Sequence, residues 1–231
     1  MAKILFVMTG ADQWTLADGS KHPTGFWAEE AVAPYRAFTA AGHEIVVATP
    51  GGVVPPLDKG SLAPELNGGQ EAADAIAAEL ASITAIQQPI KLEEADLADY
   101  AVVFYPGGHG PMEDLAVNAD SGRLLTAALE SGKPLAVVCH APAAMLAAKR
   151  ADGSWPFAGY RLTGFTNAEE TQAGFADKAK WLLQDRLVEL GADFQEGEPW
   201  APKVVVDRNL FTGQNPVSSA PLAAEVLKAL N

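Results

Sequence analysis

A lone cysteine followed by a histidine, Cys139-His140, is the pair in this sequence best suited to covalent chemistry. The apolar run from Leu135 to Val138 is typical of a buried strand, and Pro142 then opens an alanine-rich helical pattern. Cys139 is therefore predicted to lie on a sharp strand-to-helix turn, beside free helix N–H groups that stabilise a thiolate. We interpret it as a nucleophile, with a small buried hydrophobe as the alternative.

The histidines give weaker signals. His140 is placed to orient or deprotonate the thiol, but adjacency does not show that the two side chains meet. The chain has four histidines, His22, His43, His109 and His140. No two of them form an H-x₃-H or H-E-x-x-H pair. No metal site is predicted.

Glu30 is the carboxyl group with the most informative position. On a helical wheel Trp27, Ala31 and Phe38 share an apolar stripe, and Glu30 falls beside that stripe. Glu29 points toward the polar side instead. A buried carboxyl has a raised pKa, which suits a proton shuttle, whereas a carboxyl at the edge of the core reaches solvent. The helical pattern leaves both interpretations open.

A glycine-rich turn, Pro106-Gly107-Gly108-His109-Gly110, follows another predicted strand. It lacks the G-x-G-x-x-G and Walker spacings, so it does not indicate a phosphate site. Its glycines allow close approach of the backbone to a ligand, and the N–H groups of Gly107 and Gly108 are candidates for an oxyanion hole. The alternative is a plain turn.

The elements that must position these residues alternate between strands and helices. Strands are predicted over 4–8, 43–49, 100–105, 135–138, 161–165, 204–207 and 210–212, and helices over 26–41, 71–86, 118–131, 178–190 and 216–230. This order indicates an α/β fold with a mainly parallel sheet covered on both faces, in a single domain over 1–231. Ligands of such sheets bind at the carboxyl ends of the strands. The segments 9–25, 106–110, 139–140 and 165–170 all fall there, so one shared pocket is expected.

Composition excludes several classes of protein. A formal charge of −13 argues against binding to nucleic acid or an anionic membrane. One cysteine excludes an internal disulfide framework. The apolar runs are far shorter than the roughly 20 residues of a membrane helix, and no signal-peptide pattern opens the chain. A cytoplasmic enzyme is expected.

Four motifs in order resemble the ThiJ/PfpI superfamily: AVVFYPGGHG, AVVCHAPAAM, LTGFTNAEE and LFTGQNPVSS. The segment from Ser20 to Pro34 is similar to the pattern G-K-H-P-T-G-F-W-x-E-E-A-x-x-P, with Ser20 in place of the first glycine. This segment and the Thr49–Asp58 loop are similar to one branch, the heat-inducible holding chaperones that act as glutathione-independent glyoxalases (glyoxalase III). The resemblance implies a flavodoxin-like three-layer sandwich, no cofactor and a homodimer. Ala33 occupies a position that is often larger or polar in the branch, which bears on substrate preference.

The resemblance also implies roles for individual residues. Cys139 matches the nucleophile, His140 the histidine that follows it, and Glu170 the carboxylate that completes a triad. Glu30 matches the helix glutamate, and Gly107 with Gly108 the oxyanion loop. The expected reaction converts methylglyoxal or a related 2-oxoaldehyde to a 2-hydroxy acid, D-lactate. The alternatives are a protein or nucleotide deglycase, a holding chaperone or redox-stress protein with little catalysis, and, less favoured, a peptidase.

Overall fold

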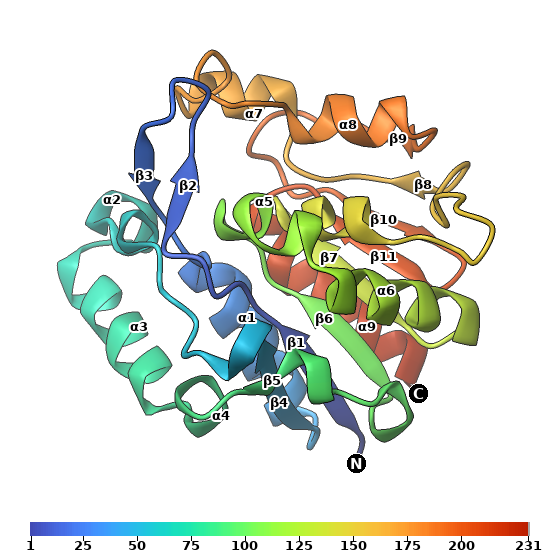
Figure 1. Cartoon of the computed structure of the whole chain (residues 1–231). Helices are drawn as coiled ribbons and strands as arrows, with labels where there is room; N and C mark the ends of the chain where they lie inside the picture. The colour runs from blue at the N-terminus through green and yellow to red at the C-terminus, as the bar shows by residue number, and fades with distance from the viewer. Residues whose placement is uncertain (231) are drawn as a thin grey trace.

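A computed structural model describes residues 1–230 as three layers, with a central sheet between helices on both faces (Figure 1). Within those residues the sheet has seven strands in the order β10-β11-β7-β6-β1-β4-β5. All neighbouring strands are parallel except β10 and β11. The predicted α/β flavodoxin-like architecture is confirmed. The strands are β1 (Lys3–Val7), β4 (Glu44–Thr49), β5 (Ile90–Lys91), β6 (Val102–Tyr105), β7 (Leu135–Val138), β10 (Val204–Asp207) and β11 (Leu210–Gly213).

Helices α1 and α9 pack against each other, while α6 packs against β7. Strands β6 and β7 are buried along their whole length because helices cover both faces of the sheet, which explains their uncharged sequences. The α-helices are α1 (Ala28–Ala40), α2 (Pro64–Asn67), α3 (Gln70–Ser82), α4 (Thr84–Gln87), α5 (Gly110–Glu113), α6 (Ala119–Ser131), α7 (Asn167–Gln172), α8 (Leu183–Glu189) and α9 (Ser219–Leu230). Short 3₁₀ helices are η1 (Pro50–Gly52), η2 (Lys59–Leu62), η3 (Leu92–Glu94), η4 (Leu97–Asp99), η5 (Leu115–Val117), η6 (Ala141–Ala147) and η7 (Pro216–Ser218).

Two small sheets lie outside the central one. Strands β2 (Gln13–Thr15) and β3 (Lys21–Pro23) form an antiparallel hairpin inside the segment predicted to be a loop. Strands β8 (Arg161–Leu162) and β9 (Asp193–Phe194) pair with each other, so the strand predicted over 161–165 is short and does not join the central sheet. In Figure 1 the β2–β3 hairpin and α7 stand at the same end of the molecule.

Several predicted helices are shorter or broken in the structure. The helix predicted over 178–190 begins only at Leu183, and the one over 71–86 divides at Ile83, which has an extended backbone. The last helix begins as the 3₁₀ turn η7, opened by a proline. Across residues 1–230, no helix is both long and apolar enough to cross a membrane.

Candidate active site

Cys139 lies at the point where β7 ends and η6 begins. Its φ of 59° is left-handed, which is uncommon for a residue with a side chain. The Cys139 N–H is held by the carbonyl of Gly213 at 2.9 Å. This strained turn is the predicted elbow, and it carries the sulfur to the edge of the cavity described below although the side chain is only 3% exposed. The segment that follows is a seven-residue 3₁₀ helix rather than the predicted α-helix.

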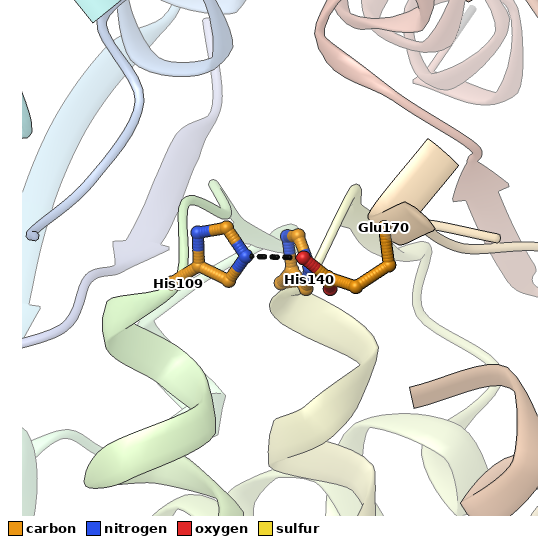
Figure 2. Close-up of side chains that lie close together, drawn as sticks. All are labelled: His109, His140 and Glu170. Atoms are coloured by element: carbon orange, nitrogen blue, oxygen red, sulfur yellow. Dashed lines mark hydrogen bonds and ion pairs between the residues drawn. The ribbon is translucent and has the colours of Figure 1, made fainter. Parts of the chain in front are cut away.

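A line of hydrogen bonds runs from the sulfur to a buried carboxyl group. Sγ of Cys139 lies 3.3 Å from Nδ1 of His140, and Nε2 of the same ring lies 2.7 Å from Oε2 of Glu170. The other oxygen of Glu170 lies 2.9 Å from Nε2 of His109. Figure 2 shows the two imidazole rings beside this one carboxyl group. The structure therefore brings Cys139, His140 and Glu170 together as expected, and adds His109.

The charge of Glu170 fixes the proton positions on both rings. Burial alone would raise its pKa, but the two histidines, His140 foremost, outweigh burial and hold the pKa of this carboxyl well below its usual range. A carboxylate only accepts hydrogen bonds, so Nε2 of each neighbouring ring must carry a hydrogen. In a neutral His140, Nδ1 is then the free base that faces the thiol.

Glu30 approaches the cysteine from α1. It is fully buried, whereas Glu29 is partly exposed, so the structure decides the open question in favour of burial. Its Oε2 accepts a 2.7 Å hydrogen bond from the N–H of Gly107, and Oε1 has no hydrogen-bond partner among the described residues. Burial raises the pKa of Glu30 to about 8, and contacts with Cys139 and Gly107 oppose this only in part. The resting carboxyl is therefore mainly protonated at neutral pH.

The resting state of Cys139 differs from the sequence-based expectation. We expected the helix N-terminus to favour a thiolate, but burial, together with the adjacent Glu30, raises the pKa of the Cys139 thiol well above its ordinary value. The N–H of Gly108 contacts the sulfur and acts in the opposite direction without reversing the shift. The thiol must therefore lose its proton to a neighbouring base as it reacts, and His140 is the base in contact with it.

The two glycines of the 106–110 turn have different partners. The N–H of Gly107 is already committed to Glu30, so only that of Gly108 faces the sulfur as an oxyanion donor. A Cβ on Gly107 would lie 2.5 Å from the carbonyl oxygen of Val138 and 2.7 Å from Oε2 of Glu30. A Cβ on Gly108 would lie 2.4 Å from the carbonyl oxygen of Gly25. Close packing around Glu30 and Gly25 therefore requires glycine at both positions.

His109 is the residue that the sequence analysis did not assign to the site. Its ring stacks on Trp14 with centroids 4.4 Å apart, and burial lowers its pKa. His109, His140 and Glu170 bring ligand atoms within 4.8 Å of one another, a donor set that fits a metal ion although the sequence shows no paired spacing. In this arrangement both rings already hydrogen-bond to the carboxylate. The sequence signal that could have assigned His109 to the site was its position directly after two glycines at the end of a strand.

The neighbouring Glu169 has a structural role. Its Oε2 accepts hydrogen bonds from the backbone and side chain of Thr166, which form a capping box at the start of α7. Its Oε1 accepts from the Trp200 N–H at 2.9 Å and from the side chains of Gln214 and Asn215. Glu169 therefore joins three segments, while Glu170, one residue further, turns toward the histidines.

A single cavity of about 1250 Å³ contains the exposed edge of this site. Cys139, His140, Gly108 and His109 line it together with residues of the β2–β3 segment and Phe165. All four segments predicted to meet at the carboxyl ends of the strands contribute to its wall, so the prediction of one shared pocket is confirmed.

Comparisons with known proteins place this geometry in a family. The model of the DJ-1/PfpI family matches residues 23–229. Glyoxalase 3 of Candida albicans is 30% identical over 99% of this chain and 98% of its own length. The protein/nucleic acid deglycase HchA of Pseudomonas aeruginosa is 30% identical over 99% of this chain and 80% of its own length.

A human protein called glutamine amidotransferase-like class 1 domain-containing protein 1 is 37% identical over 146 residues, 63% of this chain. The match spans 66% of that relative, just under two thirds of its length. Among solved structures, the crystal structure of glyoxalase III from Candida albicans superposes with a TM-score of 0.82 at 28% identity, covering 99% of this chain and 97% of that one. The fold, the full-length matches and the family model agree, and the chain belongs to the DJ-1/PfpI family, in its glyoxalase III branch.

Proposed function

We propose that this protein is a glutathione-independent glyoxalase that converts methylglyoxal or a related 2-oxoaldehyde to a 2-hydroxy acid, D-lactate from methylglyoxal. The observation that carries the proposal is a buried Cys139–His140 pair with a buried carboxyl group at each end, Glu30 next to the thiol and Glu170 next to the imidazole. Glu30, with its raised pKa, stores a proton next to Cys139, and Glu170, with its lowered pKa, holds His140 as a base. The name of the Candida albicans relative supports the same activity.

The first step forms a bond between Sγ of Cys139 and the aldehyde carbon. Nδ1 of His140, 3.3 Å from the sulfur, takes the thiol proton, and the carboxylate of Glu170 stabilises the imidazolium. The carbonyl oxygen takes the proton of the Glu30 carboxyl, and the Gly108 N–H stabilises the charge that develops on this oxygen. The product is a neutral hemithioacetal, and Glu30 is left as a carboxylate.

The second step is an internal oxidation and reduction that needs no external oxidant. The Glu30 carboxylate removes the C–H proton of the former aldehyde carbon, while His140 returns its proton to the ketone oxygen, giving an enediol. Glu30 then delivers its proton to the neighbouring carbon, and the resulting Glu30 carboxylate takes the proton of the remaining enediol hydroxyl, which leaves His140 neutral. The first carbon is oxidised to a thioester and the second is reduced to an alcohol.

Water completes the cycle. His140 removes a proton from water as the oxygen attacks the thioester carbonyl, the C–S bond breaks, and Sγ regains its proton. The 2-hydroxy acid leaves with the oxygen atom of water in its carboxylate.

The test is D-lactate production from methylglyoxal in the absence of added thiol. The unchanged protein should produce lactate, and Cys139→Ala should abolish the covalent route. Glu30→Gln lacks the acid of the first step and the base of the second, so it should produce lactate about 10²–10⁴-fold more slowly. Unimpaired turnover in both variants would overturn the mechanism.

Deglycation is the second candidate, and the names of the HchA relatives favour it. It would use the same thiol and carboxyl groups on a glyoxal adduct of a protein or nucleotide amine. A competition assay separates the two activities, because a true deglycase must repair the adduct faster than the adduct releases free aldehyde.

A holding-chaperone activity has one supporting observation. Val53, Val54 and Leu66 are exposed large hydrophobic residues in the segment between β4 and α3. Suppression of client aggregation by Cys139→Ala would establish this activity independently of catalysis.

Homodimerisation and a cytoplasmic location belong to the same proposal. Light scattering of the purified protein measures the first, and fractionation of the cells that produce it measures the second.

A further inference from the structure

The cavity at Cys139 is much larger than the smallest 2-oxoaldehyde. A molecule with five heavy atoms needs at most roughly 150 Å³, if each heavy atom takes the roughly 30 Å³ of a water molecule. The cavity measures about 1250 Å³, which is above the roughly 300–1,000 Å³ of sites for drug-sized ligands. A substrate bound through its aldehyde to Cys139 therefore has room for a large substituent on the neighbouring ketone carbon.

The cavity wall next to the reacting groups is aromatic. The Phe165 ring lies 4.3 Å from the His140 ring, and Trp200 meets Phe165 edge-on at 5.5 Å. A second aromatic pair, Phe175 and His22 with centroids 4.5 Å apart, lies beside His109. All of these rings line the cavity. Aromatic faces and edges favour flat, apolar substituents.

Charge in the cavity disfavours an anionic substituent. Three aspartates line it, Asp12, Asp58 and Asp74, against one lysine, Lys59. A negatively charged group would be repelled by this excess of carboxylates. A neutral substituent fits both the charge and the aromatic wall.

Trp200 is held over the cavity by a costly backbone conformation. Its φ of 61° lies in the left-handed region, which a bulky residue seldom adopts. The backbone N–H is fixed by the fully buried Glu169, and the indole N–H donates to Oε1 of Gln172 at 2.6 Å. The side chain is nevertheless 45% exposed, so core packing does not explain its position. Strain that the surrounding structure maintains at a site is a sign of function.

We propose that the preferred substrates of this protein are 2-oxoaldehydes with an aromatic or other flat, uncharged substituent, and that Trp200 is the specificity-determining residue. The inference rests on the glyoxalase function proposed above and names its substrate class. Phe165 and Trp200 receive the substituent while the aldehyde carbon reaches Cys139.

The kinetic test compares phenylglyoxal with methylglyoxal. The unchanged protein should have a kcat/KM about 10-fold or more higher for phenylglyoxal, a ratio typical of selection by an apolar pocket. Trp200→Gly removes the ring and suits the left-handed backbone. This variant should lose most of the preference, mainly through a higher KM for phenylglyoxal.

Two further variants sharpen this test. Trp200→Phe keeps an aromatic ring and should retain most of the preference. Arg208→Gly is the matched control, because Arg208 also has a left-handed φ, 58°, but lies in the β10–β11 turn and not in the cavity wall. It should leave the ratio unchanged. Equal kcat/KM for both aldehydes in the unchanged protein, or an unchanged ratio in Trp200→Gly, would overturn the proposal.

A binding experiment separates this proposal from the glyoxalase function. Calorimetry on Cys139→Ala compares 2-hydroxyacetophenone with hydroxyacetone, two ketols that lack the aldehyde. The aryl ketol should bind about 10-fold or more tightly, and Trp200→Gly in the same background should remove the difference. If neither aldehyde is turned over but this difference holds, the glyoxalase function fails and the aromatic site stands. Equal binding of the two ketols overturns the aromatic site even if methylglyoxal is converted.

Discussion

Glu30 and Glu170 are two buried carboxyl groups beside the same Cys139–His140 pair, yet their pKa values move in opposite directions. Glu30 faces the thiol and one backbone N–H, and burial raises its pKa to about 8. Glu170 is buried too, but two imidazole N–H groups hold its pKa well below the usual range. Burial alone therefore does not determine whether a carboxyl is charged, because the hydrogen-bond donors around it decide.

This difference divides the chemistry between the two residues. A carboxyl that holds a proton at neutral pH can give it up and then take another, which is the work of a shuttle. A carboxylate that stays charged can only orient and stabilise its partner. In the proposed mechanism the same residue type thus serves two functions within one site.

The largest expected effect tests the shuttle. Glu30→Gln should lower kcat for methylglyoxal by about 10²–10⁴, because an amide cannot transfer the proton between the two carbons. Glu29→Gln, one residue away and partly exposed, is the matched control and should keep its rate. A kcat for Glu30→Gln within 2-fold of the control would remove Glu30 from the mechanism.

A smaller loss is expected at the orienting carboxylate. Glu170→Gln should lower kcat by about 10²-fold, because an amide accepts a hydrogen bond from only one ring and favours the wrong tautomer of His140. Thr171→Ala changes the next residue of α7, which is exposed, and should leave kcat unchanged. Steady-state kinetics of the pair measure the difference, and a fully active Glu170→Gln would contradict the assignment.

The pH dependence of stability should separate the two carboxyls. In the folded protein the pKa of Glu30 lies above its ordinary value of 4.5. Its contribution to the free energy of unfolding is therefore fully present below pH 4.5 and is lost as the pH rises through about 8. Glu30→Gln should reduce that loss by at least about 1.4 kcal/mol, the equivalent of one pKa unit.

Glu170 should show the opposite dependence. In the folded protein the pKa of Glu170 is lowered. Its contribution to the free energy of unfolding is therefore present above pH 4.5, the ordinary pKa, and is lost as the pH falls below that value. Urea unfolding of the unchanged protein and both variants across this range measures the two slopes. Parallel curves for all three proteins would show that neither pKa is shifted in the folded state.

The smallest expected effect concerns His109. His109→Phe keeps a ring against Trp14 but removes one hydrogen bond to Glu170, so kcat should fall by about 2- to 12-fold, the equivalent of 0.5–1.5 kcal/mol. His109→Gln restores an N–H donor and should recover part of the rate. A merely structural role would instead lower the melting temperature of both variants and leave kcat unchanged.

Much of the fold could be predicted from short sequence patterns. The runs over 100–105 and 135–138 gave correct strands because they are buried on both faces and hence uncharged. The β2–β3 hairpin was missed because its three-residue strands carry mixed polar residues and no alternating pattern. The 161–165 segment showed strand composition, but local sequence does not say which sheet a strand joins.

Most residues of the candidate site could be named from the sequence and the family resemblance, with His109 as the exception, but their contacts could not be predicted. Helical periodicity separated Glu30 from Glu29, while the N–H that holds Glu30 comes from a residue 77 positions away. The pairing of His109 with Glu170 spans 61 positions. One signal was overlooked: Thr166 and Glu169 have capping-box spacing, which assigns Glu169 to the helix end and leaves Glu170 for the site.

Three consecutive residues after β6 each contact a different part of the site. The Gly107 N–H holds Glu30, the Gly108 N–H contacts the sulfur of Cys139, and the His109 ring contacts Glu170. The length of this turn therefore determines the positions of all three contacts together. Inserting or deleting one residue there would shift every contact by a residue at once, so the length of this turn is constrained even more strictly than its composition.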